Sequence, residues 1–174
     1  MYAKVPQGIS KREVELSLKA LFSSWEKPLN KVLLLPPDYT RFHSYAGQLS
    51  NILYHMLSSV CQVDIMPTLG THLPVSQSEW EAMFGDIPYE KMLVHNWRDE
   101  VVRIGEVPGE YVYEISEGLL NNSIPVEINR RLLDTSYDLI LSIGQVVPHE
   151  VVGMANHTKN LLVGCGGAGM INAS

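Results

Sequence analysis

The sequence has little cysteine, no long apolar run and no cluster of basic residues, and each absence excludes a class of protein. The two cysteines, Cys61 and Cys165, are isolated, which excludes a disulfide framework or a zinc ribbon and predicts a reducing, cytoplasmic location. No stretch approaches the roughly 18 apolar residues of a spanning helix, and the start lacks the apolar core of a signal peptide. The net charge of −6 comes without a basic run, so neither nucleic acid nor a membrane is an expected partner.

The common catalytic signatures are absent as well. The chain has no GxSxG elbow, no HExxH motif and no GxxxxGK[ST] loop. A metal-dependent hydrolase would need several carboxylate or histidine ligands together, and the sequence has too few. Residues 164–169 do meet the GxGxxG spacing after a strand-like run at 161–163. Two interpretations stay open for these glycines, a dinucleotide-binding loop or a plain tight turn.

What is present suits one ordinary α/β domain. The 174 residues are 45% hydrophobic and 18% charged, which is enough for a real core. Apolar runs predict strands, and apolar residues at helical spacing predict helices between them. The expected strands are 31–35, 61–66, 92–96, 124–128 and 138–142, and the expected helices are 10–25, 44–59, 76–84 and 130–133. Residues 101–116 predict a hairpin that turns at Pro108-Gly109. This order predicts a mixed, mainly parallel sheet flanked by helices, with an inserted antiparallel hairpin.

Polar and titratable side chains follow three of the predicted strands. They are Asp38, Thr40 and Arg41 after the first strand, Thr68, Thr71 and His72 after the second, and His149 and Lys159 after the last. Because parallel strands end at one edge of a sheet, the three groups should converge on one crevice. Each group also has a structural interpretation: a local Asp38–Arg41 ion pair at a turn, a loop histidine and a surface lysine.

At these residues the sequence resembles the N-terminal domain of the nickel-dependent lactate racemase family. Asp38-Tyr-Thr-Arg41 matches an Asp-x-Thr-Arg motif, and residues 70–74 match Gly-Thr-His-x-Pro. Pro148-His149 is followed ten residues later by Lys159, as in the family. The resemblance implies an isomerase that racemises or epimerises a 2-hydroxy acid by reversible hydride transfer to a nickel-pincer nucleotide.

The resemblance also implies a role for each matched residue. His72 and His149 would be the two catalytic acid/base residues, and Lys159 would tether the nickel-pincer nucleotide. Arg41 would hold the substrate carboxylate, for which a guanidinium is well shaped. The remaining two residues, Asp38 and Thr40, would shape the same pocket, by orienting Arg41 or by contacting the cofactor.

The resemblance makes residues 1–174 the N-terminal part of a longer, two-domain protein. The family's nickel-binding histidine falls just past Ser174, so no metal ligand is assigned within this chain and the fragment alone is expected to be inactive. Its expected partners are a small 2-hydroxy acid and the C-terminal domain of the same polypeptide. The alternative is a non-catalytic cofactor- or ligand-binding domain with the same fold. One departure stands out: Ala155-Asn156-His157 replaces a Ser-Gly-Gly stretch, so lactate is not assumed to be the substrate.

Overall fold

The computed structural model describes residue 3 and residues 8–149 and 153–173. The helices are α1 (Lys11–Ser23), α2 (Ala46–Leu57), α3 (Gln77–Phe84), α4 (Gly109–Ile115), α5 (Thr158–Leu162) and α6 (Ala168–Ala173). The 3₁₀ turns are η1 (Tyr39–Ser44), η2 (Tyr89–Lys91) and η3 (Arg130–Leu133). The strands are β1 (Lys31–Leu35), β2 (Gln62–Ile65), β3 (Val101–Val107), β4 (Ile124–Asn129), β5 (Leu139–Ser142), β6 (Pro148–His149) and β7 (Gly153–Met154). None of the described helices is both long and apolar enough to cross a membrane.

A parallel sheet in the order β2-β1-β5 is the centre of the body. The middle strand β1 is a continuous apolar run, as expected for a strand covered on both faces. Its Val32 and Leu34 pack on one face with α2 and α3, whereas Leu33 and Leu35 pack on the other face with Met66. This alternation follows from the two-residue repeat of a strand, and it fixes the sheet between two apolar layers.

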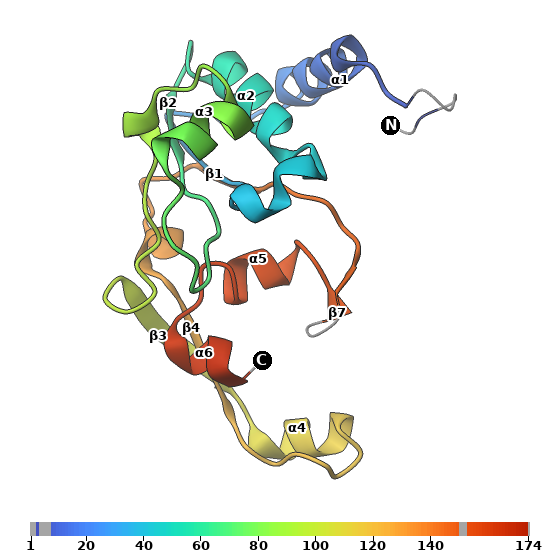
Figure 1. The fold of residues 1–174 in the computed structure, drawn as a ribbon, viewed down its shortest axis with the longest axis vertical. Coiled ribbons are helices and arrows are strands. Elements are labelled where there is room, and N and C mark those ends of the chain that lie inside the picture. Colours follow the sequence, from blue (N-terminus) through green and yellow to red (C-terminus); the bar gives the residue numbers. More distant parts are fainter. Residues whose placement is uncertain (1–2, 4–7, 150–152, 174) are drawn as a thin grey trace.

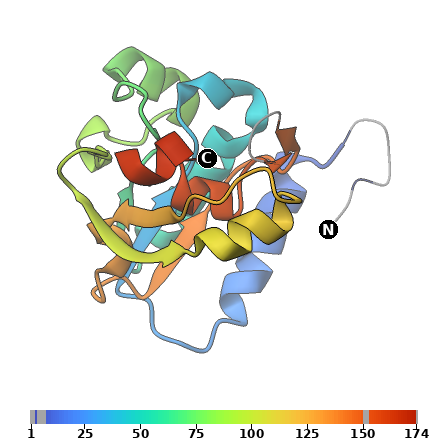
Figure 2. The same ribbon diagram turned by 90° about the horizontal axis from the view of Figure 1, so that it is seen from below.

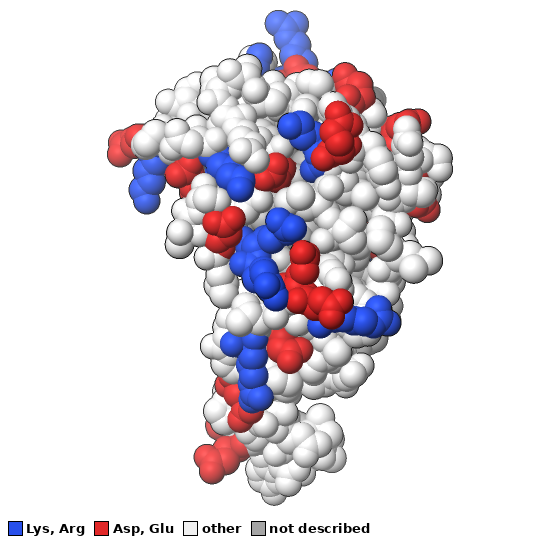
Figure 3. Space-filling model, turned by 90° about the vertical axis from the view of Figure 1, so that its left-hand side faces the viewer, with Lys and Arg blue, Asp and Glu red and all other residues white. Residues whose placement is uncertain are grey.

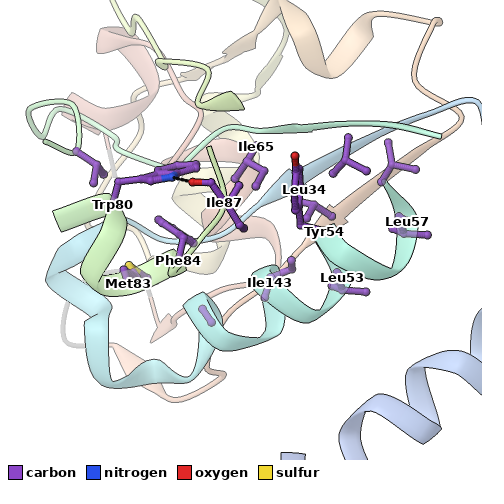
Figure 4. Packing of buried hydrophobic residues seen from close by; sticks show 14 of the residues in the cluster. Leu34, Leu53, Tyr54, Leu57, Ile65, Trp80, Met83, Phe84, Ile87 and Ile143 are labelled. Carbon is purple, nitrogen blue, oxygen red and sulfur yellow. Dashed lines mark hydrogen bonds between the residues drawn. The ribbon is translucent and has the colours of Figure 1, made fainter. Parts of the chain in front are cut away.

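The larger apolar layer lies between the sheet and helices α2 and α3 (Figure 4). Trp80 is fully buried there, and its indole N–H donates to the carbonyl of Ile87 at 2.7 Å, so the one polar atom of the ring is satisfied. The helices approach so closely that a Cβ on Gly47 would lie 2.1 Å from the carbonyl oxygen of Met83. Capping boxes at Ser10 and Ser76 start α1 and α3, as the sequence pattern predicts.

The segment β3–α4–β4 forms an arm that projects away from this body (Figures 1 and 2). β3 and β4 pair antiparallel, from Val101 opposite Asn129 to Val107 opposite Ile124. The arm ends in exposed apolar side chains: Tyr111, Tyr113, Ile115, Leu119 and Leu120. Figure 3 shows acidic and basic groups interspersed along one face, with the α4 end mostly uncharged. The antiparallel hairpin that the sequence predicts is present, but its second strand is formed by other residues than predicted.

The sequence predicted the wrong partner for β3. Residues 110–116 were expected to be the second strand of the hairpin, but they form α4, and β4 is the partner. Pro108-Gly109 looks like a turn, yet Pro108 takes extended backbone and caps a helix that Glu110 favours in its first turn.

Two further predicted strands are wrong. Within 92–96 only Met92 forms a bridge, to Ile65, because β2 is short and ends there. Residues 161–163 belong to α5 and its C-cap rather than to a strand, a confusion that short apolar runs invite. The glycines at 164–169 thus follow a helix, and the strand required before a dinucleotide-binding loop is not there.

Candidate functional site

A single cavity lies at the carboxyl edge of the parallel sheet and is lined by residues that follow β1, β2 and β5. Five of the six predicted site residues line it: Asp38, Thr40, Arg41, His72 and Lys159. The loops after β1 and β2 are joined because the N–H of Thr68 donates to the carbonyl of Pro36 at 2.8 Å. The loop after β2 reaches the C-terminal segment, where the N–H of Gly70 donates to the carbonyl of Gly164 at 2.8 Å. The ends of these three strands therefore converge on one cavity, as the sequence predicts.

Asp38 and His72 form a close pair on one side of this cavity. The Asp38 carboxylate is buried, and its Oδ2 lies 2.5 Å from Nδ1 of His72. Its other oxygen accepts hydrogen bonds from the backbone N–H and the hydroxyl of Thr40. Because a carboxylate at Nδ1 selects the tautomer with the proton there, Nε2 of His72 is left as the basic nitrogen. The pair is thus built like the base and orienting acid of a proton-transfer site.

Arg41 lies at a break in the 3₁₀ turn η1, with non-helical φ −108° and ψ 31°. The structural alternative for these residues, a local ion pair with Asp38, does not form, and that carboxylate binds His72 and Thr40 instead. Arg41 lines the cavity as an exposed guanidinium. With Lys159 it makes the cavity suited to an anion, because Asp38, the one carboxylate among the described residues of the lining, is already paired.

Lys159 reaches the cavity from α5, a helix of only five residues that follows β7. The side chain is half-buried. Two consecutive residues before the helix, Asn156 and His157, have positive φ of 60° and 48°. Such backbone is uncommon for residues other than glycine. A primary amine is therefore held at the cavity wall by an unusual turn.

His149 is the predicted site residue that the cavity lining does not include. It lies half-buried on β6, opposite Gly153 of β7. The base of this small hairpin does border the cavity, through Val147 and Ala155. Residues 150–152, at the tip of the same connection, lie outside the described residues.

Comparison with known proteins decides the family. Residues 14–174 match the family described as the lactate racemase N-terminal domain. The chain belongs to the lactate racemase N-terminal domain family. A crystal structure of a protein from Thermotoga maritima, 24% identical, has a TM-score of 0.78 over 92% of this chain, which shows the shared fold. The chain spans 39% of that protein, and no curated protein matches the sequence.

The geometry accounts for the point at which this lactate racemase domain departs from its relatives. The resemblance placed glycines where Asn156 and His157 stand, and these are the two positions with positive φ. Asparagine is the non-glycine residue that accepts left-handed backbone most readily. Asn156 is therefore suited to this turn, and its side chain lines the cavity.

Sequence reasoning missed the polar residues that support this wall. Ser142 and Asn160 were not singled out, yet their side chains hydrogen-bond with Asn156. The sequence pattern gave no signal for these contacts, because Asn156 precedes α5 and Ser142 lies 14 positions before it.

His95 is a further histidine, within the predicted strand 92–96, and the structure places it outside the cavity. Its ring is buried, with Nδ1 2.9 Å from the Asn129 amide and Nε2 3.0 Å from the carbonyl oxygen of Gly166. Burial lowers the pKa of His95, which favours the neutral ring, and both ring nitrogens are engaged by other parts of the fold. The part of the chain that the structure describes has no group of three or more His, Cys, Asp or Glu residues arranged to hold a metal ion.

Proposed function

We propose that the protein containing this domain racemises or epimerises a 2-hydroxy acid by reversible hydride transfer to a nickel-pincer nucleotide. One observation carries the proposal: a single cavity in a lactate racemase N-terminal domain joins the Asp38–His72 pair to Arg41 and Lys159. The rest of the active site is assigned to the polypeptide beyond this domain, in a second domain, because the chain spans 39% of its Thermotoga relative. A cytoplasmic location is supported by the free thiols of Cys61 and Cys165.

The chemistry of a 2-hydroxy acid favours hydride transfer. Its Cα–H is a weak acid, because the neighbouring carboxylate is already negative and a carbanion beside it is unfavourable. Removal of hydride leaves a planar 2-keto acid, and return of hydride to the other face inverts the centre. When bound, the nickel-pincer nucleotide supplies the hydride acceptor for this exchange.

His72 takes the hydroxyl proton in this scheme. Nδ1 is engaged by Asp38, so Nε2 accepts the proton, and the carboxylate stabilises the charge that the ring gains. Asp38 is thus a positioning residue for His72, whereas the resemblance implied that it orients Arg41 or contacts the cofactor. His149 is assigned the proton on the opposite face of the keto acid, from the hairpin whose base borders the cavity.

The two cationic residues suit the anionic parts of substrate and cofactor. Arg41 offers a forked donor that fits a carboxylate with two parallel hydrogen bonds. Among the described residues of the lining, Lys159 alone offers a primary amine for a covalent bond. The Thr40 hydroxyl donates a hydrogen bond to Asp38 and so helps to hold the Asp38–His72 pair in place.

The deciding experiment replaces Lys159 in the full-length holoprotein made with its cofactor-synthesis enzymes. Lys159→Arg keeps the positive charge but removes the usable amine. We expect the native protein to carry a covalent adduct on the peptide with Lys159, and the variant to lose both adduct and activity with an unchanged melting temperature. Lys19→Arg, on the surface of α1, is the matched control and should keep both.

A second readout addresses the reaction itself. In D₂O the native holoprotein should invert a 2-hydroxy acid from a panel without taking up deuterium at Cα, because the hydride returns from the cofactor. Fast uptake of deuterium would indicate proton abstraction instead. A fully active Lys159→Arg protein would contradict the tether, and a native protein that binds 2-hydroxy acids without inverting any would support the non-catalytic alternative.

A further inference from the structure

A hydrogen-bonded network of three side chains joins the start of α5 to the end of β5. Oδ1 of Asn156 accepts from the Ser142 hydroxyl at 2.8 Å and from the Asn160 amide at 2.7 Å. Nδ2 of Asn156 donates to the carbonyl of Gly144 at 2.9 Å. The Asn160 amide also lies 3.2 Å from the Ser142 hydroxyl, and Asn160 itself is 5% exposed. The oxygen and the nitrogen of the Asn156 amide are therefore both hydrogen-bonded. The contacts with Ser142 and Gly144 tie the start of α5 to the sheet edge.

The helix α5 needs such ties. It has five residues, far fewer than the roughly 12 that an isolated helix requires to be stable in water. It also starts from the two residues with positive φ, and His157, at φ 48° and ψ −133°, holds backbone that favours glycine. A short helix that begins with strained backbone keeps its place only if other contacts fix it.

Lys159 is bonded directly into this helix. Its N–H donates to the carbonyl of Asn156 at 3.1 Å, and its carbonyl accepts from the N–H groups of Val163 and Gly164. The position of the Lys159 backbone therefore follows the position of Asn156. At the other end of the helix, Gly164 is joined to Gly70 of the loop after β2, so the helix has an anchor on each side of the cavity.

We propose that Asn156 is a positioning residue for Lys159, which holds the amine at the cavity wall by tying α5 to Ser142 and Gly144. This inference rests on the proposed role of Lys159 as the cofactor tether. Loss of the Asn156 side chain removes the donor to the Gly144 carbonyl and leaves the buried Asn160 amide with the Ser142 hydroxyl alone, so the link between the turn before α5 and the sheet edge is lost. The amine then samples positions away from the cavity, and covalent loading becomes less efficient.

The test uses the full-length holoprotein with Asn156→Ala and Asn156→Gly. The glycine variant accepts positive φ at no cost, so it removes the side-chain network while keeping the backbone turn. Asn51→Ala is the matched control, because Asn51 also donates its amide to a backbone carbonyl, that of Phe84, but lies outside this cavity. The readouts are amide hydrogen exchange of residues 157–164, adduct yield at Lys159 by mass spectrometry, and kcat with KM.

We expect both Asn156 variants to raise exchange of residues 157–164 at least tenfold and to lower adduct yield at least fivefold. kcat should fall with the yield while KM stays, because the carboxylate site at Arg41 is not altered. Asn51→Ala should change none of these. Faster exchange with full adduct yield would overturn the positioning role and leave the tether in place.

Amide hydrogen exchange and adduct yield that stay at their native values in Asn156→Gly would also overturn the proposal. The backbone turn alone would then hold the helix. If instead the native protein carries no adduct, the proposed function is what fails. The exchange data still decide in that case whether Asn156 fixes α5.

Discussion

The cavity has two walls that are held in different ways. The first wall, residues 36–44 and 67–72, continues two neighbouring strands, and a parallel bridge between Pro37 and Thr68 extends their pairing into it. It rests on the apolar layer that contains Leu34, Ile65 and Trp80. The second wall, residues 142–147 and 155–164, follows the edge strand β5 and depends on the Ser142–Asn156–Asn160 network.

This difference predicts different sensitivities. Apolar packing is spread over many contacts and responds mainly to loss of volume. A side-chain network depends on each member and responds to single polar substitutions. Mutations in the apolar layer should therefore loosen the whole body, whereas polar mutations should loosen the second wall alone.

The largest effect is expected from Leu34→Ala. Leu34 is fully buried in the middle of β1, and a Leu-to-Ala change in such a core costs about 2–5 kcal/mol. The free energy of unfolding, measured by urea titration, should fall by this amount, and hydrogen exchange should rise in both walls. Leu73→Ala is the control, because that side chain is 86% exposed and should have little effect. Exchange that rises only in the second wall would contradict the comparison.

The next effect concerns activity, and it comes from the first wall. Asp38→Asn keeps the shape but loses the charge that orients and stabilises His72, so we expect a loss of activity of about 100-fold or more. The matched control is Asp86→Asn, because Asp86 also binds a histidine, His55, on the surface away from the cavity. Equal activity of the two variants would show that His72 needs no partner.

Much of the first wall could be predicted from the sequence. The strand β1 is a short apolar run and β2 alternates polar and apolar residues, and each is followed closely by proline and then by polar residues. Their convergence at one edge follows from parallel pairing. The Asp38–His72 contact itself was not predictable, because the two residues are 34 positions apart and the nearer Arg41 looked like the natural partner of Asp38.

The second wall was harder to predict for a physical reason. Residues 161–163 are apolar enough for a strand, yet they form the end of α5 and its C-cap. Positive φ at two consecutive non-glycine residues, Asn156 and His157, is not signalled by the residues themselves. The helix α4 of the arm was also missed from the sequence, because Pro108-Gly109 fits a turn and a helix start equally well.

The smallest effect is expected from a fall in pH. Protonation of His95 should weaken its hydrogen bonds and so loosen the second wall. The neutral ring accepts a hydrogen bond from Asn129 at Nδ1 and donates to Gly166, just past the second wall. Protonation would set an N–H against the Asn129 amide. Burial lowers the pKa of His95 below its usual value near 6.5, although Glu100 acts in the opposite direction.

The sign of the pH dependence follows from this shift. Above about pH 6.5 the ring is neutral in both folded and unfolded chains, so its contribution to stability is complete. As the pH falls below that value, the unfolded chain binds the proton first, and stability is lost until the folded ring also protonates. Urea unfolding at steps from pH 7 to pH 5 should show this loss in the native protein. His95→Gln, which can still donate and accept but does not titrate, should give a flatter profile. Equal slopes would show that acid acts elsewhere, and exchange of residues 155–164 should rise in acid before that of residues 67–72.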